Sequence, residues 1–147
     1  MNEVERLPFE KIHLTQIELQ PHEKEFLNLD GFTAMASQPT SRAYTYMYKE
    51  HILGFGGYYM VWPGVIEIFI VPSMYFFKYP KTCVATCKRD FELIKRNKWI
   101  HRIQTYSWDD YTRNGFMLHM GFECEGVLRR YTSSKQDYKM WSILVEA

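Results

Sequence analysis

The sequence has little cysteine, almost no net charge and no long apolar run. Its 147 residues include three cysteines, Cys83, Cys87 and Cys124, and an odd number argues against a disulfide framework. No uninterrupted apolar run approaches the roughly 20 residues that cross a bilayer, so we expect no association with a membrane. The first six residues carry charges of both signs and lead into no apolar segment, which predicts a cytoplasmic protein without a secretory signal.

The near absence of net charge also limits the partners. Eighteen Lys and Arg against 17 Asp and Glu leave a formal charge of +1, which gives no general electrostatic reason to bind nucleic acid. Cys83 and Cys87 lie four residues apart and would share one face of a helix, a spacing that can suit a metal. No matching pair of His or Cys stands at ligand spacing elsewhere, so we predict buried core thiols and no metal site.

The composition that is present is that of a globular protein. Hydrophobic residues make up 46% of the chain and charged residues 24%, and no repeat or flexible linker marks a boundary. A chain of this length can bury enough apolar surface to fold without disulfides, so we predict one domain over residues 1–147. Aromatic residues reach 17% and gather around residues 44–79, more than a small core needs, so we expect some of them to face a partner.

The first half of the sequence shows helix signals and then, from Ala43, strand signals. Pro21 suits the first turn of a helix, and Asp30-Gly31 is read as a helix stop. From Ala43 the residues become β-branched and aromatic, which predicts a strand over Ala43–Lys49 and, after a turn at Lys49–His51, a second strand over Ile52–Val61.

The second half predicts a crossover. Val65–Val71 is apolar at every position except Glu67, as expected for a central strand that is covered on both faces. An amphipathic helix follows over Thr82–Asn97, with Thr82 as its N-cap, and alternation returns over Ile100–Tyr106. Two strands joined in this way are parallel in nearly all cases.

The C-terminal third predicts one more helix and a hairpin. Asp109 is read as the N-cap of a helix that reaches His119 and ends at Gly121-Phe122. The last two strands are then expected over Phe122–Arg130 and Asp137–Val145.

This order of elements, with the run Met117-Leu118-His119-Met120-Gly121-Phe122 followed by Glu125-Gly126 and by Asp137-Tyr138-Lys139-Met140, resembles the GNAT superfamily of N-acetyltransferases. The resemblance covers the chain from Ala43 to its end. It implies an α/β (α+β) fold of a single GNAT-like domain, with a mixed central sheet of about six to seven strands and helices on both faces. It also implies transfer of an acetyl group from acetyl-CoA to an amine substrate.

A looser similarity concerns Gly56-Gly57 and the stretch Trp62–Glu67. Together with the small size, these residues resemble GNAT-like proteins that tailed bacteriophages encode near their head genes, including the internal virion protein class. This similarity implies a second possibility, a non-catalytic protein in the host cytoplasm or the virion that assembles virions or binds a host protein.

The resemblance implies where acetyl-CoA would bind. Backbone groups at Ile70 and Val71 would contact the pantetheine arm, and Lys78, Lys81 and Thr82 would contact the pyrophosphate. Family members use a glycine-rich loop here, because backbone N–H groups must approach the phosphates closely. This chain has no glycine between Tyr75 and Thr82, and Pro80 lacks an N–H group. The loop therefore either binds the cofactor through its lysines or packs against the sheet or a partner.

The catalytic assignment leaves alternatives open as well. Glu67 is the candidate general base, and the competing interpretation is that it pairs with Arg102 or His101 on the adjacent strand. The tyrosine that serves the family as general acid is replaced by Met117, which leaves Tyr111 as a substitute. Asp110 occupies the position where the family has an asparagine that contacts the cofactor arm. Whether the protein is an enzyme is left open by the sequence.

Overall fold

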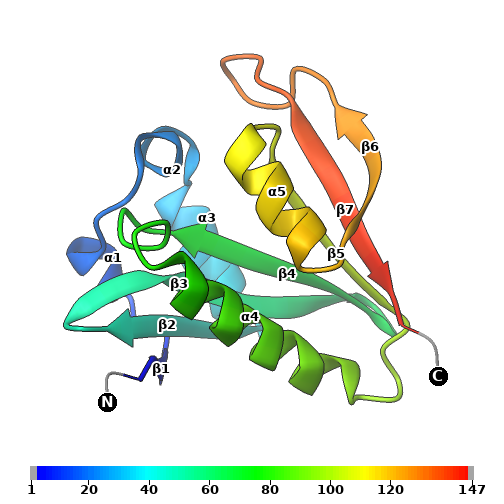
Figure 1. The fold of residues 1–147 in the computed structure, drawn as a ribbon, viewed down its shortest axis with the longest axis horizontal. Coiled ribbons are helices and arrows are strands. Elements are labelled where there is room, and N and C mark those ends of the chain that lie inside the picture. The colour runs from blue at the N-terminus through cyan, green and yellow to red at the C-terminus, as the bar shows by residue number, and fades with distance from the viewer. Residues whose placement is uncertain (1–2, 146–147) are drawn as a thin grey trace. The chain divides into compact units, whose positions relative to one another are not determined.

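The computed structural model describes residues 3–145, and within them five helices and seven strands make up an α+β fold (Figure 1). The strands are β1 (Glu5–Pro8), β2 (Arg42–Tyr48), β3 (His51–Trp62), β4 (Val65–Pro72), β5 (Arg102–Trp108), β6 (Glu123–Leu128) and β7 (Tyr138–Leu144). The helices are α1 (His13–Gln16), α2 (Pro21–Phe26), α3 (Leu29–Ala36), α4 (Pro80–Lys95) and α5 (Tyr111–His119).

The strands form one mixed sheet in the order β1-β2-β3-β4-β5-β7-β6. β4 and β5 pair in parallel and are joined through α4, which confirms the predicted crossover. The pairs β1–β2, β2–β3, β5–β7 and β6–β7 are antiparallel. The predicted fold class is therefore confirmed, although the sequence pattern missed the short strand β1.

By its internal contacts the chain divides into two compact units, and β3, β4 and α4 each pass from one into the other. Unit 1 comprises the described part of Met1–Tyr59 together with Phe69–Thr86. Unit 2 comprises Met60–Ile68 and the described part of Cys87–Ala147. The single domain expected over residues 1–147 stays a prediction.

The core of unit 1 is built from aromatic rings on α3 and β3. Phe32 of α3 and Phe55 of β3 stack with centroids 5.6 Å apart, and Phe9 meets both rings edge-on at 5.1 Å. The helix stop predicted at Asp30-Gly31 is wrong, because α3 runs through both residues. The side chain of Asn28 accepts a hydrogen bond from the Gly31 N–H at 3.0 Å, and this cap starts the helix just before them.

Two backbone features shape the strands of unit 1. The turn between β2 and β3 places Lys49 and Glu50 at φ values of 49° and 67°, in the left-handed region that favours Gly or Asn. Gly54 on β3 lies against β4, and a Cβ added there would stand 2.4 Å from the carbonyl oxygen of Val71. β3 and β4 therefore approach each other at Gly54 more closely than any side chain there would allow.

The core of unit 2 lies between its strands and two helices, α5 and the part of α4 that follows Thr86. Ile66, Ile103 and Trp141 are fully buried, and Phe91 of α4 meets Phe122 edge-on with centroids 5.7 Å apart. α5 lies along β5 (Figure 1), and its Met117 is buried.

Both helix caps predicted in the second half of the chain are wrong, at α4 by three residues and at α5 by one. α4 begins at Pro80, because proline is favoured at the first helical position, so Thr82 lies inside the first turn. The cap of α5 is Asp110, whose Oδ1 accepts a hydrogen bond from the Arg113 N–H at 2.8 Å. Asp109 instead accepts a hydrogen bond from the Asn114 side chain at 2.8 Å.

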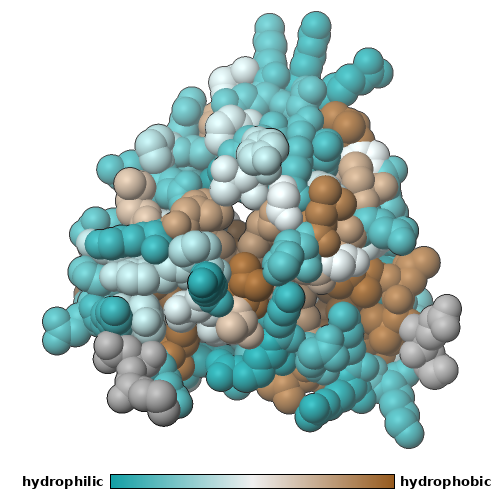
Figure 2. Space-filling view, in the orientation of Figure 1, coloured by the Kyte–Doolittle hydropathy of each residue, from teal (hydrophilic) through white to brown (hydrophobic). Residues whose placement is uncertain are grey.

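Several apolar side chains of unit 2 remain exposed at one end of its strands. They are Met60, Val61, Trp62, Trp99 and Leu144. In Figure 2 patches of brown apolar surface appear among teal residues on the right of the view, where Figure 1 draws the end of β7. Within residues 3–145, no helix has the length and apolar character needed to span a bilayer.

The close approach at Gly54 yields a stability test. We expect Gly54→Ala to lower the free energy of unfolding by about 1–3 kcal/mol, because the new methyl group meets a backbone oxygen that cannot move freely. Gly115→Ala is the matched control: nothing lies within 4 Å of a Cβ at Gly115 in α5, and alanine should stabilise that helix by up to about 1 kcal/mol. Urea unfolding of the two variants measures both effects, and equal stability of Gly54→Ala and the wild type would contradict the packing.

Candidate functional site

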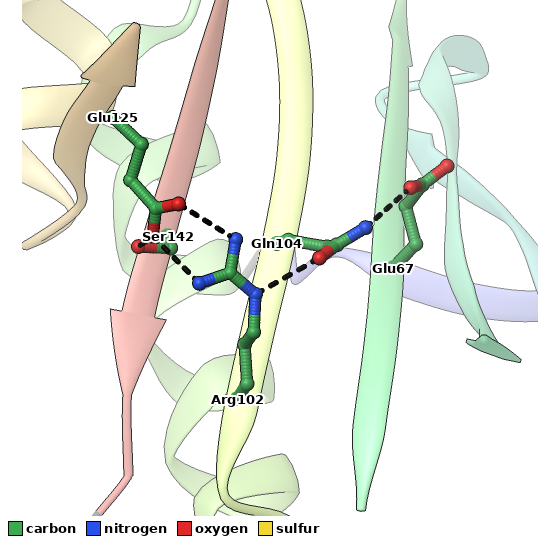
Figure 3. A network of polar contacts seen from close by, with 5 residues as sticks. All are labelled: Glu67, Arg102, Gln104, Glu125 and Ser142. Atoms are coloured by element: carbon green, nitrogen blue, oxygen red, sulfur yellow. Dashed lines mark hydrogen bonds and ion pairs between the residues drawn. The ribbon is translucent and has the colours of Figure 1, made fainter. Parts of the chain in front are cut away.

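The side chain of Glu67 is fixed by a neighbour on β5. In the parallel ladder Glu67 lies opposite Gln104, and Gln104 Nε2 donates a hydrogen bond to Glu67 Oε1 at 3.0 Å. The predicted structural partner of Glu67 was Arg102 or His101, but the residue that contacts it directly is Gln104. Glu67 is half-buried, whereas Gln104 is 9% exposed. The second carboxylate oxygen of Glu67 points away from Gln104 (Figure 3).

Gln104 is itself held by a chain of polar groups that crosses three more positions (Figure 3). Arg102 Nε donates to Gln104 Oε1 at 2.9 Å, which fixes the orientation of the amide. The two terminal nitrogens of Arg102 bind both carboxylate oxygens of Glu125, at 2.6 and 3.0 Å. Ser142 Oγ donates to Glu125, so the network runs Glu67–Gln104–Arg102–Glu125–Ser142.

Sheet geometry explains why these side chains meet. Arg102 and Gln104 are two residues apart on β5 and therefore share one face, and Ser142 on β7 lies opposite Gln104. Glu125 sits at an irregularity of β6 between Cys124 and Gly126, where a bulge redirects the side chain toward Arg102. The alternation Arg102–Gln104–Tyr106 is visible in the sequence and could have pointed to Gln104, whereas nothing in the sequence indicates the bulge.

The ion pair between Arg102 and Glu125, at the far end of the network from Glu67, shifts the pKa of both residues. The hydrogen bonds from Arg102 and Ser142 lower the pKa of Glu125 from its ordinary value of 4.5 to about 2. The same hydrogen bond with Glu125 raises the pKa of Arg102. Arg102 is therefore a permanent cation between two carboxylates, one bound directly and one through the amide of Gln104.

Tyr106 is a further ionisable group on this face that the sequence analysis did not single out. It follows Gln104 by two residues on β5, and its ring lies nearly parallel to that of Tyr131, with centroids 6.4 Å apart. Burial raises the pKa of Tyr106, and the negative charge of Glu67 raises it further. The phenol therefore keeps its proton at neutral pH and interacts with Glu67 electrostatically.

The other candidates on α5 lie in different surroundings. Tyr111 is 94% exposed, and its side chain makes no hydrogen bond or ring contact within residues 3–145. Both oxygens of Asp110 are engaged by Arg113, Oδ1 at the backbone N–H and Oδ2 in an ion pair of 2.9 Å. The catalytic role of Tyr111 and the cofactor contact of Asp110 stay predictions, and neither gains support from these contacts.

The loop after β4, in unit 1, has most of its backbone donors in use. The N–H of Met74 donates to Glu18, that of Tyr75 to the Ser73 hydroxyl, that of Phe76 to the Ser73 carbonyl, and that of Lys78 to Tyr75, at 2.8–3.2 Å. Pro80 has no N–H to give. A backbone-amide cradle of the kind that binds a pyrophosphate does not fit this segment.

The remaining predicted cofactor residues also lie in unit 1. Lys78 and Lys81 are exposed, Thr82 is half-buried, and the carbonyl of Thr82 accepts the hydroxyl of Thr86 at 2.9 Å. Ile70 is half-buried, while Val71 is part of the buried core cluster. The exposed ammonium groups of Lys78 and Lys81 can meet an anion.

The cysteines behave as separate thiols. Cys83 is buried, and burial raises its pKa to about 12, so it is a thiol of the core rather than a nucleophile. Cys87 is half-buried and Cys124 is exposed. In the part of the chain that the structure describes, no three His, Cys, Asp or Glu side chains gather in a way that could hold a metal ion.

Comparison with solved structures places the fold. Ard1 from Thermoplasma volcanium superposes with a TM-score of 0.78 at 12% identity, covering 98% of this chain and 99% of that one. The ribosomal-protein-S18-alanine N-acetyltransferase from Escherichia coli gives a TM-score of 0.73 at 11% identity, covering 100% and 96%. A ribosomal L7/L12 alpha-N-protein acetyltransferase in complex with coenzyme A gives 0.70 at 12% identity, covering 97% and 94%.

The chain therefore has the fold of the GNAT-family acetyltransferases over nearly its whole length. No protein-family model matches the sequence, and no curated protein sequence matches it.

The Arg102–Glu125 pair yields a prediction on pH-dependent stability. A carboxylate whose pKa is lower in the folded state stabilises the fold above its unfolded pKa, and this contribution is lost as the pH falls from about 4.5 toward 2. Glu125→Gln should therefore cost about 1 kcal/mol at pH 7, the modest value of a pair whose carboxylate side chain is 37% exposed, and progressively less below pH 4.5.

Urea unfolding at pH 7 and at steps down to pH 3 measures the difference. Glu123→Gln, which removes an exposed carboxylate from the same strand, is the matched control and should show a smaller change. A deficit of Glu125→Gln that is the same at every pH would contradict the assignment.

Proposed function

We propose that the protein is a GNAT-type N-acetyltransferase that transfers an acetyl group from acetyl-CoA to an amine, with Glu67 as the general base. The observation that carries this proposal is a carboxylate held in place on β4 by Gln104, in a chain whose fold is that of the acetyltransferases. Two of the fold neighbours are named for N-acetylation of ribosomal proteins, which supports an amine as the acceptor.

The reaction needs a deprotonated amine, and Glu67 can supply this. Gln104 Nε2 donates to one oxygen of the carboxylate, which fixes the orientation of Glu67 on the face of β4 and β5. An ammonium group there would give its proton to Glu67 and become a nucleophile. Arg102 and Glu125 act through Gln104, because together they prevent its amide from rotating.

Tyr106 is the candidate general acid on this face, the group that would protonate the departing thiolate of coenzyme A. Its Oη holds a proton at neutral pH, since burial and the charge of Glu67 both raise its pKa. Met117, at the position of the family's usual tyrosine, is buried and has no proton to donate. The acetyl group itself would come from acetyl-CoA, whose phosphates would meet Lys78, Lys81 and Thr82 rather than a backbone cradle.

A non-catalytic role is the second candidate. The engaged backbone amides of the loop after β4 favour it, because they remove the usual means of binding the donor. The exposed apolar side chains around Trp62 and Leu144 offer a surface for a protein partner. The resemblance to proteins of phage virions stays a prediction within this second candidate.

Glu67→Gln tests the first candidate directly. We expect it to lower kcat about 10²- to 10⁴-fold, the usual contribution of a general base, measured as release of the coenzyme A thiol with a panel of primary-amine peptides. The deficit should shrink as the pH rises, because the free amine becomes abundant without the base. Glu123→Gln is the control. An equal rate for Glu67→Gln and the wild type, or no turnover with any amine in the wild type, would contradict the proposal.

The coupling between Glu67 and Tyr106 can be tested without any substrate. Glu67→Gln removes a negative charge that raises the pKa of the Tyr106 phenol, so the pKa should fall in the variant. Carbon-13 NMR of ring-labelled tyrosine, titrated with pH, measures this shift. Glu123→Gln, which removes an exposed carboxylate of β6, is the control and should leave the Tyr106 titration unchanged. An unchanged Tyr106 titration in Glu67→Gln would exclude it as the partner of Glu67.

A further inference from the structure

Two turns of unit 2 are fixed side by side at one end of its strands. One joins β3 to β4 at Pro63-Gly64, and in the other, between α4 and β5, the Ile100 N–H donates to the Asn97 carbonyl at 3.0 Å. The Gly64 carbonyl accepts the backbone N–H of His101 at 2.8 Å. A Cβ at Gly64 would stand 2.3 Å from His101 Nδ1, so the two turns are in close contact.

Each turn presents a tryptophan to the surface. Trp62, the last residue of β3, is 68% exposed, and Trp99, in the turn after α4, is 52% exposed. Ile100, which follows Trp99, is only 2% exposed and anchors this turn in the core of unit 2. The two indole rings are therefore held outward by a fixed backbone.

The end of β7 adds apolar surface beside the two turns. The Val145 N–H donates to the His101 carbonyl at 2.9 Å, which places Leu144 next to the turn after α4. Figure 1 draws the loop after α4 and the end of β7 together at the lower right of the view, where Figure 2 shows brown apolar patches. The tryptophan patch consists of the exposed apolar side chains at this end: Met60, Val61, Trp62, Trp99 and Leu144.

The charges around the tryptophan patch have one sign. Arg96 and Lys98 are exposed between α4 and β5, and Lys98 directly precedes Trp99. The described segments that form this end contain no Asp or Glu. These segments are 60–65, 96–102 and 144–145. Apolar side chains and exposed cations are thus combined here, in a chain whose net charge is only +1.

This combination does not suit a second copy of the chain. In a symmetric dimer the same patch contacts itself, so Arg96 and Lys98 of one copy would be brought toward those of the other. Like charges that meet in an interface from which water is excluded oppose association. The occupant that the charges favour is anionic and has apolar surface as well.

A bilayer with anionic headgroups has both properties. Tryptophan is favoured at the boundary between headgroups and acyl chains, because its ring is apolar and its N–H group is polar. Lysine and arginine beside it can reach lipid phosphates while their alkyl stems stay in apolar surroundings. The expectation of no membrane association rests on the lack of a spanning segment, and a surface that lies on a bilayer needs none.

We propose that the tryptophan patch, together with Arg96 and Lys98, is a docking surface for membranes that contain anionic lipids. Trp62 and Trp99 enter the headgroup region, and the two cations pair with lipid phosphates and carboxylates. The contact is reversible, because it uses a few side chains and no covalent anchor. It does not depend on the proposed acetyltransferase activity.

The experiment is co-sedimentation of the full chain with vesicles of equimolar phosphatidylcholine and phosphatidylserine, and with vesicles of phosphatidylcholine alone. We expect stronger binding to the mixed vesicles, which weakens as salt screens the headgroup charge. Trp62→Ala and Trp99→Ala should each lower the partition coefficient about tenfold, as for one apolar side chain that is no longer buried. Lys98→Gln should lower it about fivefold on the mixed vesicles.

Matched controls carry the same kinds of change away from the patch. Lys88→Gln removes an exposed cation of α4, and Tyr111→Ala removes an exposed ring of α5, so both should bind as the wild type does. Lys98→Arg should keep the affinity, because the charge remains. Thermal melting of each variant at the wild-type temperature shows that a weaker binder is still folded.

Fluorescence locates the contact independently of affinity. Lipids brominated on their acyl chains quench tryptophans that enter the bilayer, so the wild type should be quenched on the mixed vesicles. The double variant Trp62→Phe with Trp99→Phe should still bind and lose most of the quenching, since Trp141 is 1% exposed and stays in the core. Quenching that persists in this variant would contradict the placement.

Three other results overturn the proposal. One is vesicle binding that is the same in Trp62→Ala and Trp99→Ala as in the wild type. Another is no sedimentation of the wild type with the mixed vesicles at millimolar lipid. The third is a dimer, seen by sedimentation velocity without vesicles, that Trp62→Ala abolishes, because the patch would then be an interface between copies of the chain.

Discussion

The parallel pairing of β4 with β5 decides where every polar group around Glu67 lies. Because Glu67 stands opposite Gln104, the two side chains emerge on the same face and meet at 3.0 Å. Arg102 reaches Gln104 from two residues earlier on the same strand, and Glu125 reaches Arg102 from β6. A shift of this register by one residue would turn Glu67 to the opposite face and separate it from all of them. The position of Glu67, the proposed general base, therefore depends on the backbone hydrogen bonds between β4 and β5, although these bonds do not themselves contact a substrate.

Charged side chains are held in place differently on the face of β4 and β5 and in the loop after β4. On the face of β4 and β5, charge is controlled by pairing: Glu125 stays ionised beside Arg102, and Gln104 transmits the orientation of that pair to Glu67 without carrying charge itself. In the loop after β4, aromatic rings fix the positions of lysines, while the backbone amides bond to one another and to neighbouring segments of unit 1. The first arrangement orients the carboxylate that we propose as the base, and the second fixes the positions of lysine ammonium groups at the surface of unit 1.

Sequence patterns predicted the strands and the crossover well, because alternation and apolar runs reflect burial that the structure confirms. They failed at the helix starts: Asn28 and Asp110 are the observed caps, and α4 begins at Pro80, two residues before Thr82. The choice among such positions depends on hydrogen bonds a few residues away. Glu67 was singled out as the one charged residue of an apolar strand. Glu125 could not be, because its direction depends on a bulge.

The place of β7 in the sheet has a consequence for how the chain is made. Of the seven strands within residues 3–145, β7 is synthesised after the other six, yet it lies between β5 and β6 and pairs with both. Until it emerges from the ribosome, β6 has no partner in the final sheet, and the edge of β5 that β7 will cover is open. All residues of unit 1, by contrast, have been made once Thr86 has been added. The nascent chain therefore exposes an unpaired strand edge late in synthesis, the stage at which association with another chain competes most directly with folding.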